Sequence, residues 1–146
     1  MSIPPKKILL AIDGYEGPSP SINTAVELAN GFGAELHVVH VGILYYGAHF
    51  EPMSPGQLEQ FKDRAQIRLD SNKKEIENLG GKVTQSHLRL GDVDGEVLRL
   101  SDELQVDMIV IGSRKQSAAS RILLGNDAES IVRHAPCSVL VVRRED

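Results

Sequence analysis

Short apolar runs recur along the chain and predict five β-strands. Three of these strands, over 6–12, 107–111 and 138–142, each hold at least four apolar residues in succession. Continuous apolar runs are typical of strands that are covered on both faces, as in parallel sheets. A further strand is predicted over 35–41, and a weaker one over 82–90 mixes polar with apolar residues. That mixture favours a position at an edge of the sheet for the 82–90 strand.

Apolar residues at helical spacing fill the gaps between these strands. Two helices are expected to begin at Ser19-Pro20 and Ser54-Pro55, because serine caps a helix start and proline suits the first helical position. Two more are expected across 93–104 and 126–135, the second of which ends before Pro136. The apolar residues expected to face the sheet are Ile22, Ala25, Val26, Ala29, Leu58, Phe61, Ala65, Leu69, Ile76, Leu79, Val93, Val97, Leu100, Leu104, Ala128, Ile131, Val132 and Ala135.

The alternation of strands and helices predicts an α/β fold. Right-handed crossovers give a parallel sheet with helices on both faces, and five strands with an early weak edge fit the order 3-2-1-4-5 of doubly wound, Rossmann-like sheets. A chain of 146 residues suits a single domain over 1–146. In this order the winding reverses between the first and fourth strands. The loops that begin at Asp13 and Gly112 are therefore the expected ligand site.

Composition narrows the class of protein. A formal net charge of -4 argues against nucleic-acid binding. The single cysteine, Cys137, makes no intramolecular disulfide and suits a small buried apolar position. No apolar run is long enough to span a bilayer, and the first seven residues lack the pattern of a signal peptide. We therefore expect a cytoplasmic protein without a nucleic-acid or membrane partner.

The segment after the fourth strand, 112–121, is basic and rich in hydroxyl groups. It leads through Gly125 to a predicted helix start, where free N–H groups and the helix dipole favour an anion such as a phosphate. The alternative is a solvated loop before a helix that Asn126 and Glu129 cap between them, and spacing alone ranks this alternative first. Neither a Walker-type phosphate loop nor the three spaced glycines of a dinucleotide site is present.

The remaining candidate residues do not form a catalytic or metal-binding pattern. His37 and His40 are predicted on opposite faces of one strand, His87 is isolated on the edge strand, and no pair has metal-ligand spacing on one face. Asp13 alone does not make a phosphorylation site of the response-regulator type. Such a site needs neighbouring acids and a lysine near the last strand, where this chain has arginines.

Four phrases of the sequence resemble the universal stress protein family. They are ILLAIDG at 8–14, LHVVHV at 36–41, VDMIVIGS at 106–113 and, most specifically, RHAPCSVLVV at 133–142, preceded by LLG at 123–125. The resemblance covers essentially the whole chain. It implies the adenine nucleotide alpha hydrolase-like fold and a regulatory role in the stress response that depends on binding rather than catalysis.

Family members that bind ATP resemble one another in a motif of glycine, two residues, glycine, nine residues, glycine and a hydroxyl residue. Gly112 and Gly125 match the outer glycines, whereas Lys115 replaces the middle glycine, Asn126 the hydroxyl residue and Asp127 an apolar residue. Lysine fills space that glycine leaves for a phosphate, although its charge partly compensates, and Asp127 repels a phosphate. The resemblance thus implies an altered, weak site around Ile12, Asp13, Val41, Gly112, Ser113, Arg114, Lys115, Gly125, Asn126 and Asp127.

Three functions are consistent with these residues. The first is a stress-response regulatory protein with a weak site for ATP, or another adenine nucleotide, with Mg²⁺. The second is a ligand-free homodimer that serves as an interaction module for another protein. The third is a weak nucleotide hydrolase, which ranks last because the sequence contains no recognisable base or metal cluster and assigns no catalytic residue.

The last strand indicates how a homodimer would form. Val139, Leu140, Val141 and Val142 would lie on an edge strand with no proline or charge within the apolar run. Pairing with a two-fold copy of the same strand would cover its free backbone groups. Universal stress proteins that resemble this chain commonly associate in this way.

Overall fold

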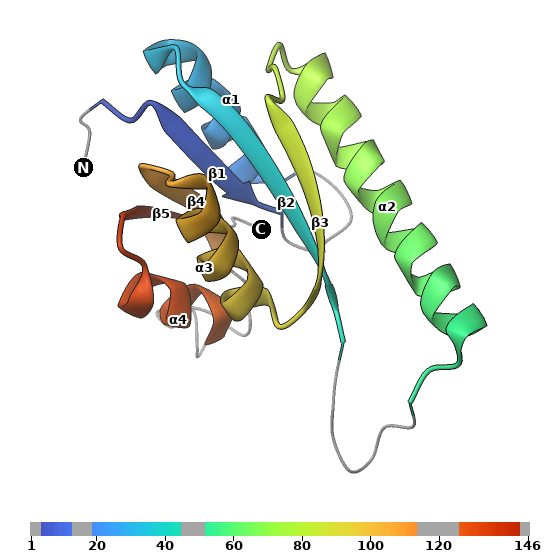
Figure 1. Ribbon diagram of the computed structural model, residues 1–146. Coiled ribbons are helices and arrows are strands. Elements are labelled where there is room, and N and C mark those ends of the chain that lie inside the picture. The colour runs from blue at the N-terminus through green and yellow to red at the C-terminus, as the bar shows by residue number, and fades with distance from the viewer. Residues whose placement is uncertain (1–3, 13–18, 45–51, 114–125, 144–146) are drawn as a thin grey trace.

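The structure is a computed structural model, and it describes residues 4–12, 19–44, 52–113 and 126–143. Its strands and helices alternate along the chain (Figure 1). In chain order they are β1 (Lys7–Ala11), α1 (Pro20–Phe32), β2 (Glu35–Ile43), α2 (Pro55–Asn78), β3 (Gln85–Gly91), α3 (Val93–Leu104), β4 (Met108–Ser113), α4 (Asn126–His134) and β5 (Ser138–Arg143).

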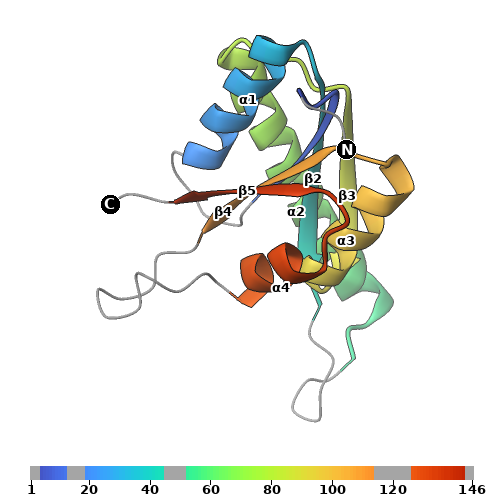
Figure 2. The same ribbon diagram turned by 90° about the vertical axis from the view of Figure 1, so that its left-hand side faces the viewer.

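The five strands form one parallel sheet in the order β3-β2-β1-β4-β5, which confirms the predicted topology. The first strand is central, so Ala11 lies between Val39 of β2 and Ile111 of β4. Helices α1 and α2 cover one face, and α3 and α4 cover the other (Figures 1 and 2). The weak third strand lies at an edge, as its polar composition predicts.

Alternate side chains of the central strands contribute to two cores on opposite faces of the sheet. Ile8 and Leu10 are fully buried on the side of α1 and α2, whereas Leu9 is fully buried on the side of α3 and α4. Burial of one such side chain contributes about 1.5–3 kcal/mol. The continuous apolar run of β1 is explained by this double coverage.

Both predicted serine-proline helix starts are confirmed, but only Ser54 caps its helix through the side chain, since Ser19 makes no side-chain capping hydrogen bond. Ser19 and Ser54 have extended backbones and each is followed by proline in the first turn. At α2 the capping is reciprocal, since the Gln57 backbone N–H donates to Ser54 Oγ at 3.2 Å and the Ser54 N–H donates to Gln57 Oε1 at 2.9 Å. Helix α1 ends at Gly33, whose φ of 66° lies in the left-handed region that favours glycine.

Two side chains expected in the core are exposed instead. Leu79 is 46% exposed because it follows the last helical residue of α2, at the C-cap. Val132 is 47% exposed. It follows the fully buried Ile131, so the buried face of the short helix α4 is narrower than the spacing of its apolar residues predicts.

The second strand is longer than predicted, because it continues through Gly42 to Ile43 and remains paired with β3. The glycine does not mark a loop. A Cβ at position 42 would lie 2.9 Å from Leu90 Cδ2 and 3.0 Å from Phe61 Cε1. Glycine is present here because the α2 side chain Phe61 packs directly on the sheet at this point.

Candidate functional site

The predicted site lies where β1, β2 and β4 end side by side. The Ile12 N–H, one residue past β1, donates to the Val39 carbonyl at 2.9 Å and so continues the β1–β2 pairing. Val41 lies two residues further along β2, and Gly112 and Ser113 are the last residues of β4. The structure thus brings Ile12, Val41, Gly112 and Ser113 to the same carboxyl edge of three neighbouring strands, where doubly wound folds bind ligands.

Ile12 and Val41 belong to opposite cores. Ile12 is buried in the cluster beneath α1 and α2, and Val41 is buried in the cluster beneath α3 and α4. Both side chains therefore stabilise the fold irrespective of any ligand. Gly112 and Ser113 are partly exposed and present backbone and hydroxyl groups at the strand end.

Several predicted site residues lie outside the described part of the chain. Asp13, Arg114, Lys115 and Gly125 fall in this group, as does the side chain of Asn126. Their assignment to the site, and the proposed Asn126–Glu129 cap, rest on the sequence.

The last helix begins at Asn126, as predicted, and its first turn is acidic. Asp127 is exposed there, and Glu129 accepts a hydrogen bond from Arg133 Nη2 at 3.1 Å. Acidic groups at a helix N-terminus complement the helix dipole and stabilise the helix. They also place negative charge beside the end of the loop that was expected to hold a phosphate.

A hydrogen bond between helices fixes α4 relative to α3. Ser130 Oγ donates to Asp94 Oδ2 at 2.7 Å, from the second turn of α4 to the first turn of α3. The helix that follows the candidate phosphate loop is thereby connected to a second helix on the same face of the sheet (Figure 2).

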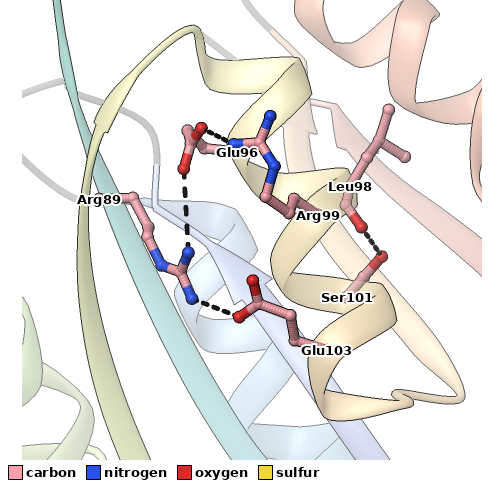
Figure 3. Close-up of polar contacts among 6 residues, drawn as sticks. All are labelled: Arg89, Glu96, Leu98, Arg99, Ser101 and Glu103. Atoms are coloured by element: carbon pink, nitrogen blue, oxygen red, sulfur yellow. Dashed lines mark hydrogen bonds and ion pairs between the residues drawn. The ribbon is translucent and has the colours of Figure 1, made fainter.

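A charged network connects β3 with α3 (Figure 3). Arg89 pairs in register with Val41, and its Nη2 donates to Glu103 Oε2 at 2.6 Å while its Nη1 lies 3.9 Å from Glu96 Oε1. Arg99 also pairs with Glu96. The hydrogen bond from Arg89 lowers the pKa of the Glu103 carboxyl from its ordinary value.

Sequence reasoning missed this network. The available signal was the seven-residue spacing of Glu96 and Glu103, which puts both on one face of a helix, opposite an arginine on the neighbouring edge strand. Arg89 of the edge strand is thus paired with two carboxylates of α3.

The histidines are arranged differently from the prediction in one respect. His37 and His40 do lie on opposite faces of β2. His37 alternates with Val39 in the core beneath α3 and α4, whereas His40 alternates with Val38 in the core beneath α1 and α2. His87, however, is not isolated, because its ring stacks on that of His37 with centroids 5.8 Å apart. Adjacent strands bring the two rings together, which the pattern of each strand alone does not reveal. Within the described residues, no group of three histidine, cysteine or acidic side chains is placed to hold a metal ion.

Cys137 is half-buried and packs against the core beneath α3 and α4. Burial, reinforced by the charge of Asp107, raises the pKa of its thiol. The protonated thiol is a poor nucleophile, consistent with a packing role. Across the described helices, none is both long and apolar enough to cross a membrane.

Comparison with known proteins yields one family. The model of the Universal stress protein family matches residues 4–143. A Staphylococcus aureus (strain USA300) protein that bears the universal stress protein name is 34% identical over 142 residues, covering 97% of this chain and 86% of that protein.

Two solved structures share the fold at low sequence identity. One is a universal stress protein in complex with cAMP, with a TM-score of 0.70, 18% identity, and coverage of 94% of this chain and 97% of that one. The other is a universal stress protein family protein from Arabidopsis thaliana with AMP bound, with a TM-score of 0.62, 18% identity, and coverage of 97% and 93%.

Proposed function

The chain belongs to the universal stress protein family, and from that premise we propose that it is a stress-response regulatory protein with a weak adenine-nucleotide site. The proposed site is the carboxyl edge of β1, β2 and β4. The observation that carries the proposal is the position of Ile12, Val41, Gly112 and Ser113 at one edge of the sheet, with the outer glycines of the family motif at 112 and 125.

The ligands of two proteins with this fold support the class of nucleotide. One holds cAMP and the other AMP. Adenine and ribose are common to both and to ATP, whereas the phosphates differ. The family resemblance implies that Asp13 and Val41 line the adenine and ribose end, and the changes from the family motif fall at the phosphate end.

Those changes are the reason for proposing weak binding. Lys115 adds a side chain where the family motif has glycine, and Asn126 replaces a hydroxyl. Asp127 and Glu129 add negative charge in the first turn of α4. Magnesium would arrive with the phosphates of ATP, since Mg²⁺ commonly binds through phosphates and few carboxylates, and the described residues offer no three-ligand cluster of their own.

Isothermal titration calorimetry with ATP and MgCl₂ tests this proposal. We expect a dissociation constant above about 100 μM, which corresponds to less than about 5.5 kcal/mol of binding free energy. Titration with AMP, which places less charge against the acidic first turn, serves as the comparison. Micromolar or tighter binding of ATP would show that Lys115, Asn126 and Asp127 are tolerated, and the weak site would then be rejected.

A ligand-free homodimeric interaction module is the second candidate. The feature that favours it is β5, an edge strand whose four consecutive apolar residues, 139–142, are all only partly buried. Nucleotide retained after purification would favour the first function over the second. Turnover of ATP above a buffer control would instead support a weak hydrolase, which ranks last.

A further inference from the structure

Two histidines, the buried His37 and the partly buried His87, stack on the face of the β2–β3 edge that α3 covers. His37 is 3% exposed, and its ring stacks on that of the partly buried His87 with an interplanar angle of 22°. Both lie on the face that α3 covers, because His37 alternates with Val39 and Val41 in the core beneath that helix, and His87 is in register with Val39. This pair plays no part in the proposed nucleotide site.

Three of the four ring nitrogens are buried without a hydrogen-bond partner. They are His37 Nδ1, His37 Nε2 and His87 Nε2. A neutral imidazole has one N–H and one lone pair, whereas an imidazolium has two N–H donors and a positive charge. Protonation here would therefore add both an unpaired donor and a charge to a desolvated place, and each is unfavourable.

The charged groups around the pair do not compensate a proton well. Lys7 of β1 acts on His37 and Arg89 of β3 acts on His87, and both repel a second positive charge. Glu35 of β2 favours protonation of His37, but its side chain is half exposed and its Oε1 lies 3.6 Å from His37 Nε2, beyond a hydrogen bond. Glu103 of α3 favours protonation of His87, but its carboxylate is bound to Arg89.

We propose that the His37–His87 pair is an acid-sensitive latch, which holds α3 against the β2–β3 edge at neutral pH and releases it when either ring takes up a proton. The release would extend along the same face, because Asp94 at the other end of α3 accepts the hydrogen bond from Ser130 of α4. The signal to which this pair responds is protonation of an imidazole ring. With no third ligand placed beside the pair among the described residues, a bound metal ion is not favoured.

The sign of the effect follows from the environment of each ring. Burial lowers the pKa of His37 against the opposing charge of Glu35, and the weaker effect of the Lys7 charge adds to the lowering. Burial, the charge of His37 and the charge of Arg89 lower the pKa of His87. Each ring thus binds a proton less readily in the folded than in the unfolded state. The stabilisation is complete above the unfolded value of about 6.5 and is lost as the pH falls below it.

Backbone amide hydrogen exchange of the full chain at pH 7.5 and pH 5.5 tests the latch, once the measured rates are corrected for the pH dependence of intrinsic amide exchange. We expect a several-fold increase in local opening of Val93–Leu104 at the lower pH, within the limit of about tenfold per histidine per pH unit. In the double variant His37→Gln/His87→Gln the increase should vanish. An increase that persists in this variant, or none in the unaltered protein, would overturn the proposal.

His40 provides a matched control, because it is a histidine of the same strand on the opposite face. Burial, followed by the charge of Arg68, lowers its pKa too, but it faces α2 rather than α3. His40→Gln should leave the acid response of α3 unchanged. If the double variant does not fold, NMR titration of the unaltered protein decides: ring resonances of His37 and His87 that titrate at or above the free-histidine value would refute the latch.

Discussion

At the scale of single residues, Gly81, like Gly42, lies at a point of close packing between elements of this molecule. A Cβ on Gly81 would lie 2.8 Å from Ile76 Cγ2, 3.0 Å from Val26 Cγ2 and 3.1 Å from the Ile76 carbonyl oxygen. Ile76 and Val26 are buried residues of α2 and α1, so neither is free to move aside. Gly31 differs, because it lies inside α1 and a Cβ added there would meet nothing within 4 Å.

The two glycines give opposite predictions for the same substitution. Gly81→Ala should destabilise the protein by about 1–3 kcal/mol, through overpacking between α1 and α2. Gly31→Ala should stabilise it by about 0.5–1 kcal/mol, because alanine has the higher helix propensity. Urea denaturation of both variants beside the unaltered protein measures the difference. Equal effects of the two substitutions would show that the packing at Gly81 relaxes at little cost.

The phosphate end of the proposed site makes a second prediction at this scale. The double variant Lys115→Gly/Asn126→Ser restores the family motif at both positions. ATP should bind to it about tenfold or more tightly than to the unaltered protein, because one recovered hydrogen bond to a charged group contributes about 1.5–3 kcal/mol. Calorimetry with ATP and MgCl₂ measures the change. The matched control variant Lys82→Gly makes the same lysine-to-glycine change before β3, away from the family motif in the sequence, and should leave ATP binding unaltered. No gain in the double variant would mean that these two residues are not what weakens the site.

At the scale of elements, the order and type of every strand and helix could be predicted from the sequence. Three strands are continuous apolar runs, β2 is largely apolar and β3 mixes polar with apolar residues. Each predicted serine-proline start does begin a helix. The details that failed depend on neighbours that are distant in the sequence. Gly42 continues β2 because β3 pairs beside it, and His87 contacts His37 only because their two strands are adjacent.

The candidate site was predictable to a smaller extent for the same reason. Strand order alone locates the edge where Ile12, Val41 and Gly112 meet, and the sheet has that order. The Arg89 network depends on how α3 lies across β3, which neither periodicity nor a family motif specifies (Figure 3). Side-chain contacts between different strands and helices therefore could not be predicted from the sequence pattern.

At the scale of the whole molecule, the two edges of the sheet differ in character. The β3 edge begins with the exposed, polar Gln85 and Ser86 and carries Arg89 further along. Charged and polar residues protect an edge strand from pairing with another chain. The β5 edge has an apolar run whose alternate side chains pack partly against both cores, with Leu140 on one face and Val141 on the other. Of the two edges, β5 is therefore the one suited to self-association.

We accordingly predict a homodimer in which β5 pairs antiparallel with its two-fold copy, and proline substitution tests it. Successive N–H groups of a strand point to opposite sides, so of Leu140→Pro and Val141→Pro one removes a hydrogen bond to β4 and the other removes one to the partner. The first should lower the melting temperature, whereas the second should keep the fold and shift the protein to monomer in sedimentation velocity at micromolar concentration. The unaltered protein should sediment as a dimer. A monomeric unaltered protein, or a dimer that survives both substitutions, would exclude β5 as the interface.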